Sequence, residues 1–389
     1  MSVAVPPQQP VKVPLLLEDS SLCVAVRPEM YEAELEAKSR RLRERFAAAG
    51  VALPANLELH RSQPTGFRQR AEFGVWHKDE RSFFCMFEEK RPVEIASFPM
   101  GSKRLRDAMD GVLRCVLASE TVLRRGLFQA RFHTTLSGEA LVTLIYRRKL
   151  DAAWSAEAEA LRSSLGLQGV VGRSKGQKLV ARRDSVTERL PVNGAQLEYE
   201  QLEGTFSQSN AGVAAQMLSW ASDAALGGAA SARDDDLLEL YCGSGSFTVA
   251  LAPRFRRVLA TEISKAATAV AVRNAERNGV ANIAMGRVSA EELRQAMDGV
   301  RPFERLKHVR LDELRLNTVL VDPPRAGLGA EVACFLARFD RIVYISCNPE
   351  TLVDDLGHLR TTHAVSRAAI FDQFPYTHHL ECGVLLERR

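Results

Sequence analysis

One cysteine stands where its thiol could act as a nucleophile. Cys347 follows a run of β-forming residues, Ile342–Ile345, and precedes Asn348-Pro349, which ends a strand and forces a turn. A second rigid turn, Asp322–Arg325, stands shortly before it in the sequence. Side chains at the carboxyl ends of strands in an open α/β sheet face the ligand crevice. The alternative is a buried cysteine that only packs, so the rest of the chain has to decide.

A glycine-rich turn between a strand and a helix indicates a cofactor site. Residues 237–241 predict a strand that runs into 243–245, a Gly-Ser-Gly turn whose backbone can approach a ligand closely. About twenty residues later, the strand 258–261 ends in Glu262, and an acid there can bind both ribose hydroxyls of an adenosine. The third glycine of the dinucleotide fingerprint is absent, and the acidic Glu239 suits a cationic methionine group. The pattern therefore favours S-adenosylmethionine over a dinucleotide.

Composition restricts the class of protein. The chain has 389 residues, of which 46% are hydrophobic and 26% charged, so it is globular and large enough for two domains. It has no apolar run that could span a bilayer and no signal-peptide core, which favours a cytoplasmic protein without a membrane partner. The seven cysteines are scattered without CxxC spacing, which argues against disulfides, a metal site or an iron–sulfur cluster. A net charge of +4 is compatible with a nucleic-acid partner.

Two domains are expected after an N-terminal extension. Residues 1–28 contain prolines and no periodicity, and the sequence assigns them no role. A smaller α/β domain is expected over 29–200, opening with a charged helix over 31–49. In this domain residues 67–76 alternate between apolar and polar, which predicts a half-buried strand. The second domain is expected over 201–389.

Basic residues recur along the first domain. They stand at Arg124-Arg125, Arg147, Arg148, Lys149, Arg173, Lys175, Lys178 and Arg182-Arg183. A single pair of this kind is best explained as a solvated face. Several clusters in one domain favour a surface that binds phosphate groups.

The rhythm of the second domain is typical of a parallel sheet. Short apolar strands at 237–241, 318–321 and 341–345 alternate with helical segments. Residues 368–371 and 383–386 form a last strand pair separated by too few residues for a helical crossover. We therefore expect these two strands to be antiparallel neighbours at the end of the sheet.

Three long motifs resemble the RNA uracil-5 methyltransferase family. They are Asp322-Pro323-Pro324-Arg325-Ala326-Gly327, then Ile342-Val343-Tyr344-Ile345-Ser346-Cys347-Asn348-Pro349-Glu350-Thr351, and Phe371-Asp372-Gln373-Phe374-Pro375-Tyr376-Thr377-His378-His379-Leu380-Glu381. The resemblance runs from about Gly66 to the C-terminus and is greatest to the tRNA members, which make ribothymidine in the T-loop. It implies a Rossmann-like class I methyltransferase sheet with an antiparallel terminal strand pair, plus a smaller N-terminal α/β RNA-binding domain.

The resemblance also implies the roles of individual residues. Cys347 would be the nucleophile, and Glu381 the base that removes the uracil C5 proton. S-adenosylmethionine would be held by Gln208, Tyr241, Gly243, Ser246, Glu262 and Asp322, with Ser246 standing where the family has asparagine. RNA contacts, in the T-arm of tRNA, would come from Arg68, Arg70, Phe128, Arg147, Arg148 and Lys149. Neither a metal nor an obligate protein partner is implied.

The same residues suit one reaction chemically. Uracil C5 is a weak nucleophile, but addition of a thiolate at C6 makes an enolate that can attack a sulfonium methyl group. A base must then remove the C5 proton so that the thiolate can leave. Three other classes remain open at this point: a cytosine-5 methyltransferase, a non-catalytic RNA-binding protein with a methyltransferase fold, and a nicotinamide-dependent oxidoreductase.

Overall fold

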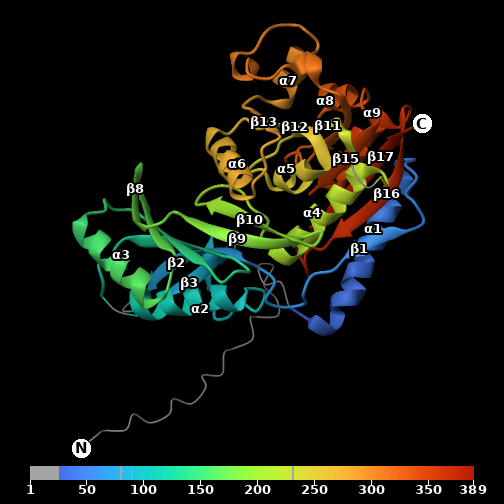
Figure 1. Cartoon of the computed structure of the whole chain (residues 1–389). Helices are drawn as coiled ribbons and strands as arrows, with labels where there is room; N and C mark the ends of the chain where they lie inside the picture. The colour runs from blue at the N-terminus through green and yellow to red at the C-terminus, as the bar shows by residue number, and fades with distance from the viewer. Residues whose placement is uncertain (1–25, 79–80, 89, 119, 230–231) are drawn as a thin grey trace, which may run out of the picture.

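The computed structural model describes residues 26–78, 81–88, 90–118, 120–229 and 232–389. Most of the expected N-terminal extension, residues 1–25, lies outside the described residues. The described chain forms two lobes, with the smaller one built mainly from the first half of the chain (Figure 1). A long hairpin runs between the lobes.

Eight strands form one large sheet in the described part of the chain. In spatial order they are β1 (Leu57–His60), β16 (His363–Phe371), β17 (Glu381–Arg388), β15 (Arg341–Ser346), β14 (Leu316–Val321), β11 (Ala232–Leu240), β12 (Phe255–Thr261) and β13 (Ile283–Gly286). All pairings are parallel except those of β17, which is antiparallel to both β15 and β16. The expected parallel sheet with an antiparallel terminal pair is confirmed.

Helices cover both faces of this sheet. They are α1 (Tyr31–Ala48), α7 (Ala290–Met297), α8 (Ala330–Leu336) and α9 (Pro349–Leu359) on one face, and α4 (Ala211–Leu226), α5 (Ser246–Leu251) and α6 (Lys265–Arg277) on the other. Successive strand residues alternate between the two cores: Leu238 and Leu240 belong to the core on the side of α1, whereas Leu237 belongs to the core on the side of α4. This period of two, with apolar residues on both sides, is the pattern of a strand buried between two helical layers.

The segment that begins at residue 29 was expected to open the first domain, but it packs on the large sheet of the second lobe. The predicted charged helix is α1, but its apolar face, which includes Leu35, Leu42 and Phe46, packs into the core of the large sheet. The strand that follows, β1, pairs in parallel with β16 at the sheet edge. Residues 31–60 therefore belong structurally with the second lobe.

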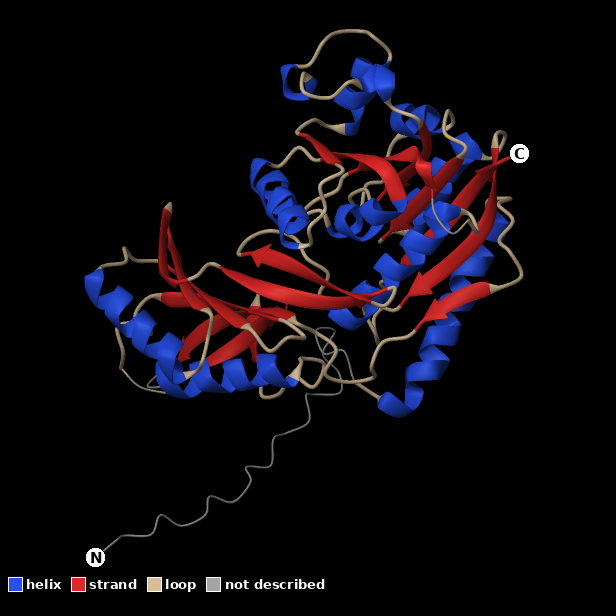
Figure 2. Cartoon of the chain, in the orientation of Figure 1, coloured by secondary structure: helices blue, strands red, loops and turns tan. Residues whose placement is uncertain are grey.

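The smaller lobe is a seven-stranded sheet with helices on one face (Figure 2). Its strands, in spatial order within the described residues, are β4 (Arg91–Glu94), β3 (Arg81–Glu88), β2 (Arg70–Lys78), β5 (Leu127–Thr134), β6 (Ala140–Tyr146), β7 (Gly169–Ser174) and β8 (Gln177–Arg182). Its helices are α2 (Lys103–Val112) and α3 (Ala152–Ser164), which pack on the sheet through a separate apolar core. The strand expected over 67–76 is β2.

A two-stranded hairpin joins the lobes. It consists of β9 (Ser185–Val192) and β10 (Ala195–Leu202), which pair with each other. Three of its buried residues, Leu190, Val192 and Tyr199, belong to the same core as α4 and α5, whereas Val186 packs with Leu141 and Val171 of the small sheet. The expected boundary at residue 200 thus falls inside a hairpin that packs on the second lobe, and the chain leaves the small sheet near Arg182.

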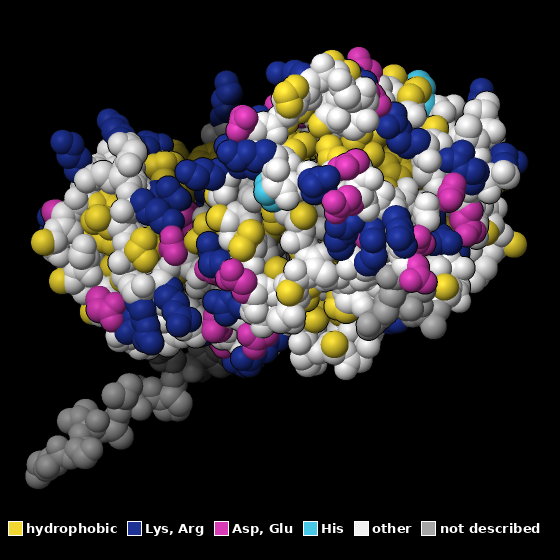
Figure 3. Space-filling view, turned by 45° about the horizontal axis from the view of Figure 1, so that its top comes forward, with side chains coloured by type: hydrophobic (Ala, Val, Ile, Leu, Met, Phe, Trp, Pro, Cys, Tyr) yellow, Lys and Arg dark blue, Asp and Glu magenta, His cyan; other side chains and the backbone are white. Residues whose placement is uncertain are grey.

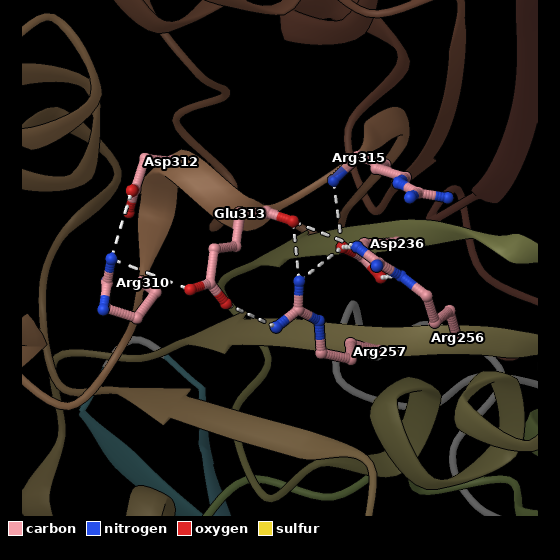
Figure 4. A network of polar contacts seen from close by, with 7 residues as sticks. All are labelled: Asp236, Arg256, Arg257, Arg310, Asp312, Glu313 and Arg315. Carbon is pink, nitrogen blue, oxygen red and sulfur yellow. Dashed lines mark hydrogen bonds and ion pairs between the residues drawn. The ribbon is translucent and has the colours of Figure 1, made fainter.

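A buried carboxylate links central strands of the large sheet on the side opposite their carboxyl ends. Asp236 is fully buried and accepts hydrogen bonds from Arg256, 2.8 Å to Oδ1 and 2.5 Å to Oδ2, and from the backbone N–H of Arg315 at 2.9 Å (Figure 4). Burial opposes its ionisation, but the bonds from Arg256 and the Arg315 N–H hold its pKa below the ordinary value. Asp236 therefore joins β11 to β12 and to the start of β14.

Replacing Asp236 with asparagine should lower the free energy of unfolding at pH 7 by about 2 kcal/mol, because a buried, charge-assisted network loses its anion. The pKa of Asp236 is depressed on folding, so this stabilisation is present above the carboxyl's ordinary pKa and disappears as pH falls through the folded value. Thermal unfolding of both proteins across an acid pH series measures the effect. Asp312→Asn is the control, because the ion pair of Asp312 with Arg310 is exposed and its loss should hardly change the free energy of unfolding. Equal midpoints for wild type and Asp236→Asn at pH 7 would contradict this role.

Candidate active site

The glycine-rich turn after β11 takes a backbone conformation that few residues accept. Tyr241, Gly243 and Gly245 all have positive φ, of 60°, 54° and 77°. A Cβ on Gly245 would lie 3.0 Å from the Cβ of Ala271 in α6, so only glycine lets the turn pack there. A Cβ on Gly243 would meet no atom within 4 Å. The turn thus places bare backbone at an open cavity.

Glu262 fixes the relation between this turn and the next strand. It directly follows β12, and its Oε2 accepts the N–H of Gly243 at 3.1 Å. Its Oε1 accepts the N–H of Ser264 at 2.7 Å, so the carboxylate is held by one bond to each oxygen. Each oxygen keeps a lone pair for a further donor such as a ribose hydroxyl.

The loop that carries Cys347 is tied to the loop after β14. Asn348 caps α9 through its side chain, which accepts the N–H of Glu350 at 3.2 Å, and Pro349 occupies the first turn. The amide of Asn348 also donates to the carbonyl of Arg325 at 3.1 Å. The two turns noted in the sequence are therefore one rigid unit, with Cys347 half-buried in it.

Glu381 reaches the same edge of the sheet because β17 runs backwards. Glu381 is the first residue of β17 and pairs with Phe371, the last residue of β16. The next residue, Cys382, pairs with Ser346 at the end of β15. The start of an antiparallel strand lies beside the ends of its parallel neighbours, which brings Glu381 next to Cys347.

All eight residues expected to be catalytic or to bind the cofactor line one cavity of about 600 Å³. They are Gln208, Tyr241, Gly243, Ser246, Glu262, Asp322, Cys347 and Glu381. The cavity lies at the carboxyl edge of the large sheet, where ligands bind in open α/β folds. Their positions follow from the order and direction of the strands.

Burial raises the pKa values of the acidic groups in the site, so these groups hold their protons to higher pH than exposed ones do. Burial raises the pKa of Asp322 to about 7, and it raises the pKa of Glu381 well above the ordinary carboxyl value, with Asp322 adding to the effect. Burial, then Glu381 and Asp322, raise the pKa of Cys347 to about 11, while Arg325 acts in the opposite direction. The site is therefore short of positive charge.

Cationic S-adenosylmethionine fits this cavity better than a pyrophosphate would. Beneath the glycine turn, the carboxyl oxygens of Glu239 are buried without a hydrogen-bond partner in the described structure. Burial, with Asp322 adding to the effect, raises the pKa of Glu239 to about 8, while Thr248 acts in the opposite direction. A sulfonium or ammonium group would relieve this surplus of acidic groups, whereas phosphate oxygens would add to it.

Several residues that line the cavity were not predicted from the sequence. They are Leu190, Tyr199, Gln201, Phe206, Ser207, Ala214, Met217, Leu218, Phe247 and Ile263. Most come from the hairpin and α4, which approach the sheet edge only in the folded chain. Ile263 differs, because it directly follows Glu262, the acid at the end of β12, and so has a local signal in the sequence.

Two of the expected RNA contacts lie close to the cofactor cavity. Arg68 and Arg70 line a neighbouring cavity of about 310 Å³ between β2 and the chain that follows the hairpin. A guanidinium nitrogen of Arg70 donates to Ser207 Oγ at 2.9 Å, and Arg68 Nε donates to the carbonyl of Arg70 at 2.7 Å. Arg70 thereby holds the loop that carries Gln208.

The other expected RNA contacts lie farther out on the small lobe. Arg147 lies over the ring of Phe128, 5.1 Å from its centre, and both line a cavity of about 530 Å³. Lys149 is exposed. Arg148 differs, because its guanidinium donates to the carbonyls of Arg125, Lys149 and Val122. Its geometry favours a structural role. Lys and Arg side chains are spread over the small lobe and the junction of the lobes, interspersed with acidic ones (Figure 3).

Neither a metal cluster nor a membrane span is found in the described residues. No group of three or more His, Cys, Asp or Glu side chains there could hold a metal ion. No helix among those residues is long and apolar enough to cross a membrane.

The sheet order, the glycine turn and the acid at the end of β12 define a class I, S-adenosylmethionine-dependent methyltransferase. A family model described as tRNA (Uracil-5-)-methyltransferase matches residues 30–389. The chain belongs to that family, and it is a tRNA uracil-C5 methyltransferase. The match begins before Gly66, in agreement with the packing of α1 and β1 on the large sheet.

Individual relatives are similar over nearly their whole length. The tRNA/tmRNA (uracil-C(5))-methyltransferase of Chromohalobacter salexigens is 49% identical over 371 residues, covering 94% of this chain and 97% of the relative. The protein of that name from Cellvibrio japonicus is 49% identical over 363 residues, covering 92% and 96%. The crystal structure of Pyrococcus abyssi tRNA (uracil-54, C5)-methyltransferase with S-adenosyl-L-homocysteine has a TM-score of 0.70. It is 22% identical and covers 96% of this chain and 88% of that one, so it shows the fold.

Replacing Glu262 with alanine should weaken S-adenosylmethionine binding ten- to a hundredfold, or roughly 1.5–3 kcal/mol, because a hydrogen-bonded carboxylate is lost. The affinity of Glu262→Gln should lie between those of wild type and Glu262→Ala, since glutamine keeps an acceptor oxygen. Isothermal titration calorimetry measures both. Glu276→Ala, an exposed acid on α6, is the control. Unchanged affinity in Glu262→Ala would remove Glu262 from the cofactor site.

Proposed function

We propose that this enzyme methylates C5 of a uridine in the T-loop of tRNA, forming 5-methyluridine, through a covalent bond between Cys347 and uracil C6. The observation that carries the proposal is that Cys347 and Glu381 line the same cavity as the glycine turn and Glu262. A nucleophile, a base and a methyl donor can then meet around one base. A tRNA substrate would place the reaction in the cytoplasm.

The proposed reaction has three steps. The Cys347 thiolate adds to C6, and the electron pair of the C5–C6 bond moves into an enolate. C5 of the enolate attacks the sulfonium methyl group, and S-adenosylhomocysteine leaves with the electron pair of the broken C–S bond. The Glu381 carboxylate takes the C5 proton, the double bond re-forms, and the thiolate is expelled.

The electrostatics suit the order of these steps. With a pKa of about 11, the Cys347 thiol is protonated in the free enzyme at neutral pH. A bound sulfonium cation would favour the thiolate, as Arg325 already does. Burial raises the pKa of Glu381, so its ionised form is a stronger base than an exposed carboxylate. The reactive ionisation states would thus form when both substrates are present.

A stacked uracil must leave its loop to reach Cys347. Enzymes that act on bases turn the target nucleotide out of the stack. The basic small lobe would hold the T-arm, with Arg68 and Arg70 beside the cofactor loop and the Phe128–Arg147 pair farther out. Aromatic rings and guanidinium planes are the groups on which exposed RNA bases stack.

Methylation of unmodified tRNA with labelled S-adenosylmethionine, followed by nucleoside analysis and digestion mapping, tests this function. We expect one 5-methyluridine, in the T-loop, and none in a tRNA whose T-loop uridine is replaced by cytidine. Formation of 5-methylcytidine would favour the cytosine-5 alternative, and a label outside the T-arm would refute the proposed target.

A further inference from the structure

A second cavity meets the cofactor cavity at Cys347. Its volume is about 460 Å³, and Cys347 and Arg325 line both cavities. Its outer wall is α1, which contributes Lys38, Arg41 and Arg45. None of these three was expected to be near the site, because basic residues on a charged helix resemble a solvated face.

The charge of this cavity is strongly positive. Its lining holds the four cations just named and a single carboxylate, that of Glu350. Lys38 is buried and already paired with Asp372 at 2.7 Å, and Arg45 pairs with Glu350 at 2.9 Å. Within the described residues, Arg41 and Arg325 show no ion pair. Two cations are therefore left to bind an anion.

The geometry of the reaction decides which anion belongs there. In the function proposed above, the methyl donor would fill the cavity on one side of Cys347, so the uracil would approach the thiol from a side that the cofactor leaves free. A nucleotide held there carries its own phosphates, and phosphate contacts are what position nucleic acid on a protein. Arginine on a rigid helix is well suited to a phosphodiester, because its planar fork binds two oxygens.

We propose, on the basis of the function proposed above, that this cationic cavity binds the phosphodiester backbone beside the target uridine, with Arg41 as a direct contact. Helix α1 then has two roles. Lys38 holds the loop before Glu381 by its bonds to Asp372 and to the carbonyl of Phe374 at 2.8 Å. Arg41, one turn further along, faces the RNA.

The test compares Arg41→Ala with Arg40→Ala. Arg40 is the neighbouring exposed arginine, paired with Glu36 and outside the cavity, so it controls for the loss of one surface charge. T-arm RNA binding is measured with S-adenosylhomocysteine present across a salt series. Arg41→Ala should bind about tenfold more weakly at low salt and flatten the slope of log affinity against log salt by about one unit. Arg40→Ala should match wild type within about twofold.

Neutral methylphosphonate linkages locate the contact. Introduced one at a time around the target uridine, one of them should weaken wild-type binding and leave the affinity of Arg41→Ala unchanged, because the interaction is already lost. Equal behaviour of Arg41→Ala and Arg40→Ala, or additive effects at every linkage, would overturn the inference. If 5-methyluridine still forms in that case, the proposed function stands. If wild type makes no 5-methyluridine, the function itself fails.

Discussion

Replacing Cys347 with alanine should abolish methylation and the covalent enzyme–RNA species together. Without the thiolate, C6 adds no nucleophile, and C5 stays too electron-poor to attack the sulfonium. We expect a rate lower by ~10⁴ or more, as for loss of other covalent nucleophiles. Cofactor affinity should stay within a few fold, since the glycine turn and Glu262 are untouched. Denaturing electrophoresis with tRNA and S-adenosylmethionine, together with calorimetry, measures both.

Other cysteines serve as controls for this result. Cys242 and Cys382 lie near the site but are buried, and burial raises the pKa of each thiol further from neutrality. Cys334, in α8, is exposed and does not line the cavity, so Cys334→Ala should behave as wild type. A covalent band that persists in Cys347→Ala would assign the nucleophile elsewhere.

Replacing Glu381 with glutamine should stop the reaction at a later step. The thiol is intact, so the adduct forms and receives the methyl group, but the C5 proton is not removed efficiently. Loss of a general base costs about 10²–10⁴ in rate, enough for the methylated adduct to accumulate. A retarded, protease-sensitive RNA band should therefore appear with Glu381→Gln and be absent with Cys347→Ala.

The far end of the same strand provides the control for Glu381. Glu387 lies six residues after Glu381 in β17, where its carboxylate forms an ion pair with Arg341 at 3.8 Å. Glu387→Gln changes the same strand at a residue that does not line the cavity, so this variant should methylate tRNA at the wild-type rate. If Glu381→Gln formed no adduct, the carboxyl would be needed before or during addition to C6, and its role as the C5 base would be wrong.

Features encoded by short stretches of sequence were predictable. The turn at 243–245, Glu262 and the loop around Cys347 each depend on a strand and the few residues after it. Because parallel strands end at one edge of the sheet, recognising the strands was enough to bring these residues together. The antiparallel terminal pair followed from the short connection between 371 and 383.

Features that depend on distant parts of the chain were not predictable. Strand β1 pairs with β16, and Lys38 bonds to Asp372 across 334 positions, yet neither segment carries a local sign of its partner. Charged residues dominate α1, so its buried apolar face did not reveal which core it joins. The hydrogen bonds of Arg148 could not be predicted either, because the carbonyl groups that accept them are placed by the fold of neighbouring loops.

In the proposed mechanism, Cys347 is bonded to the uracil while the methyl group is transferred. In tRNA containing 5-fluorouridine, a C5–F bond replaces C5–H, so Glu381 has no proton to remove and the methylated adduct persists. Trypsin digestion should yield the peptide 342–360, in which Cys347 is the only cysteine. We predict that mass spectrometry finds one methylated fluorouridine nucleotide on that peptide. A nucleotide on the peptide of Cys242 or Cys382, or methyl transfer to tRNA without any adduct, would contradict this mechanism.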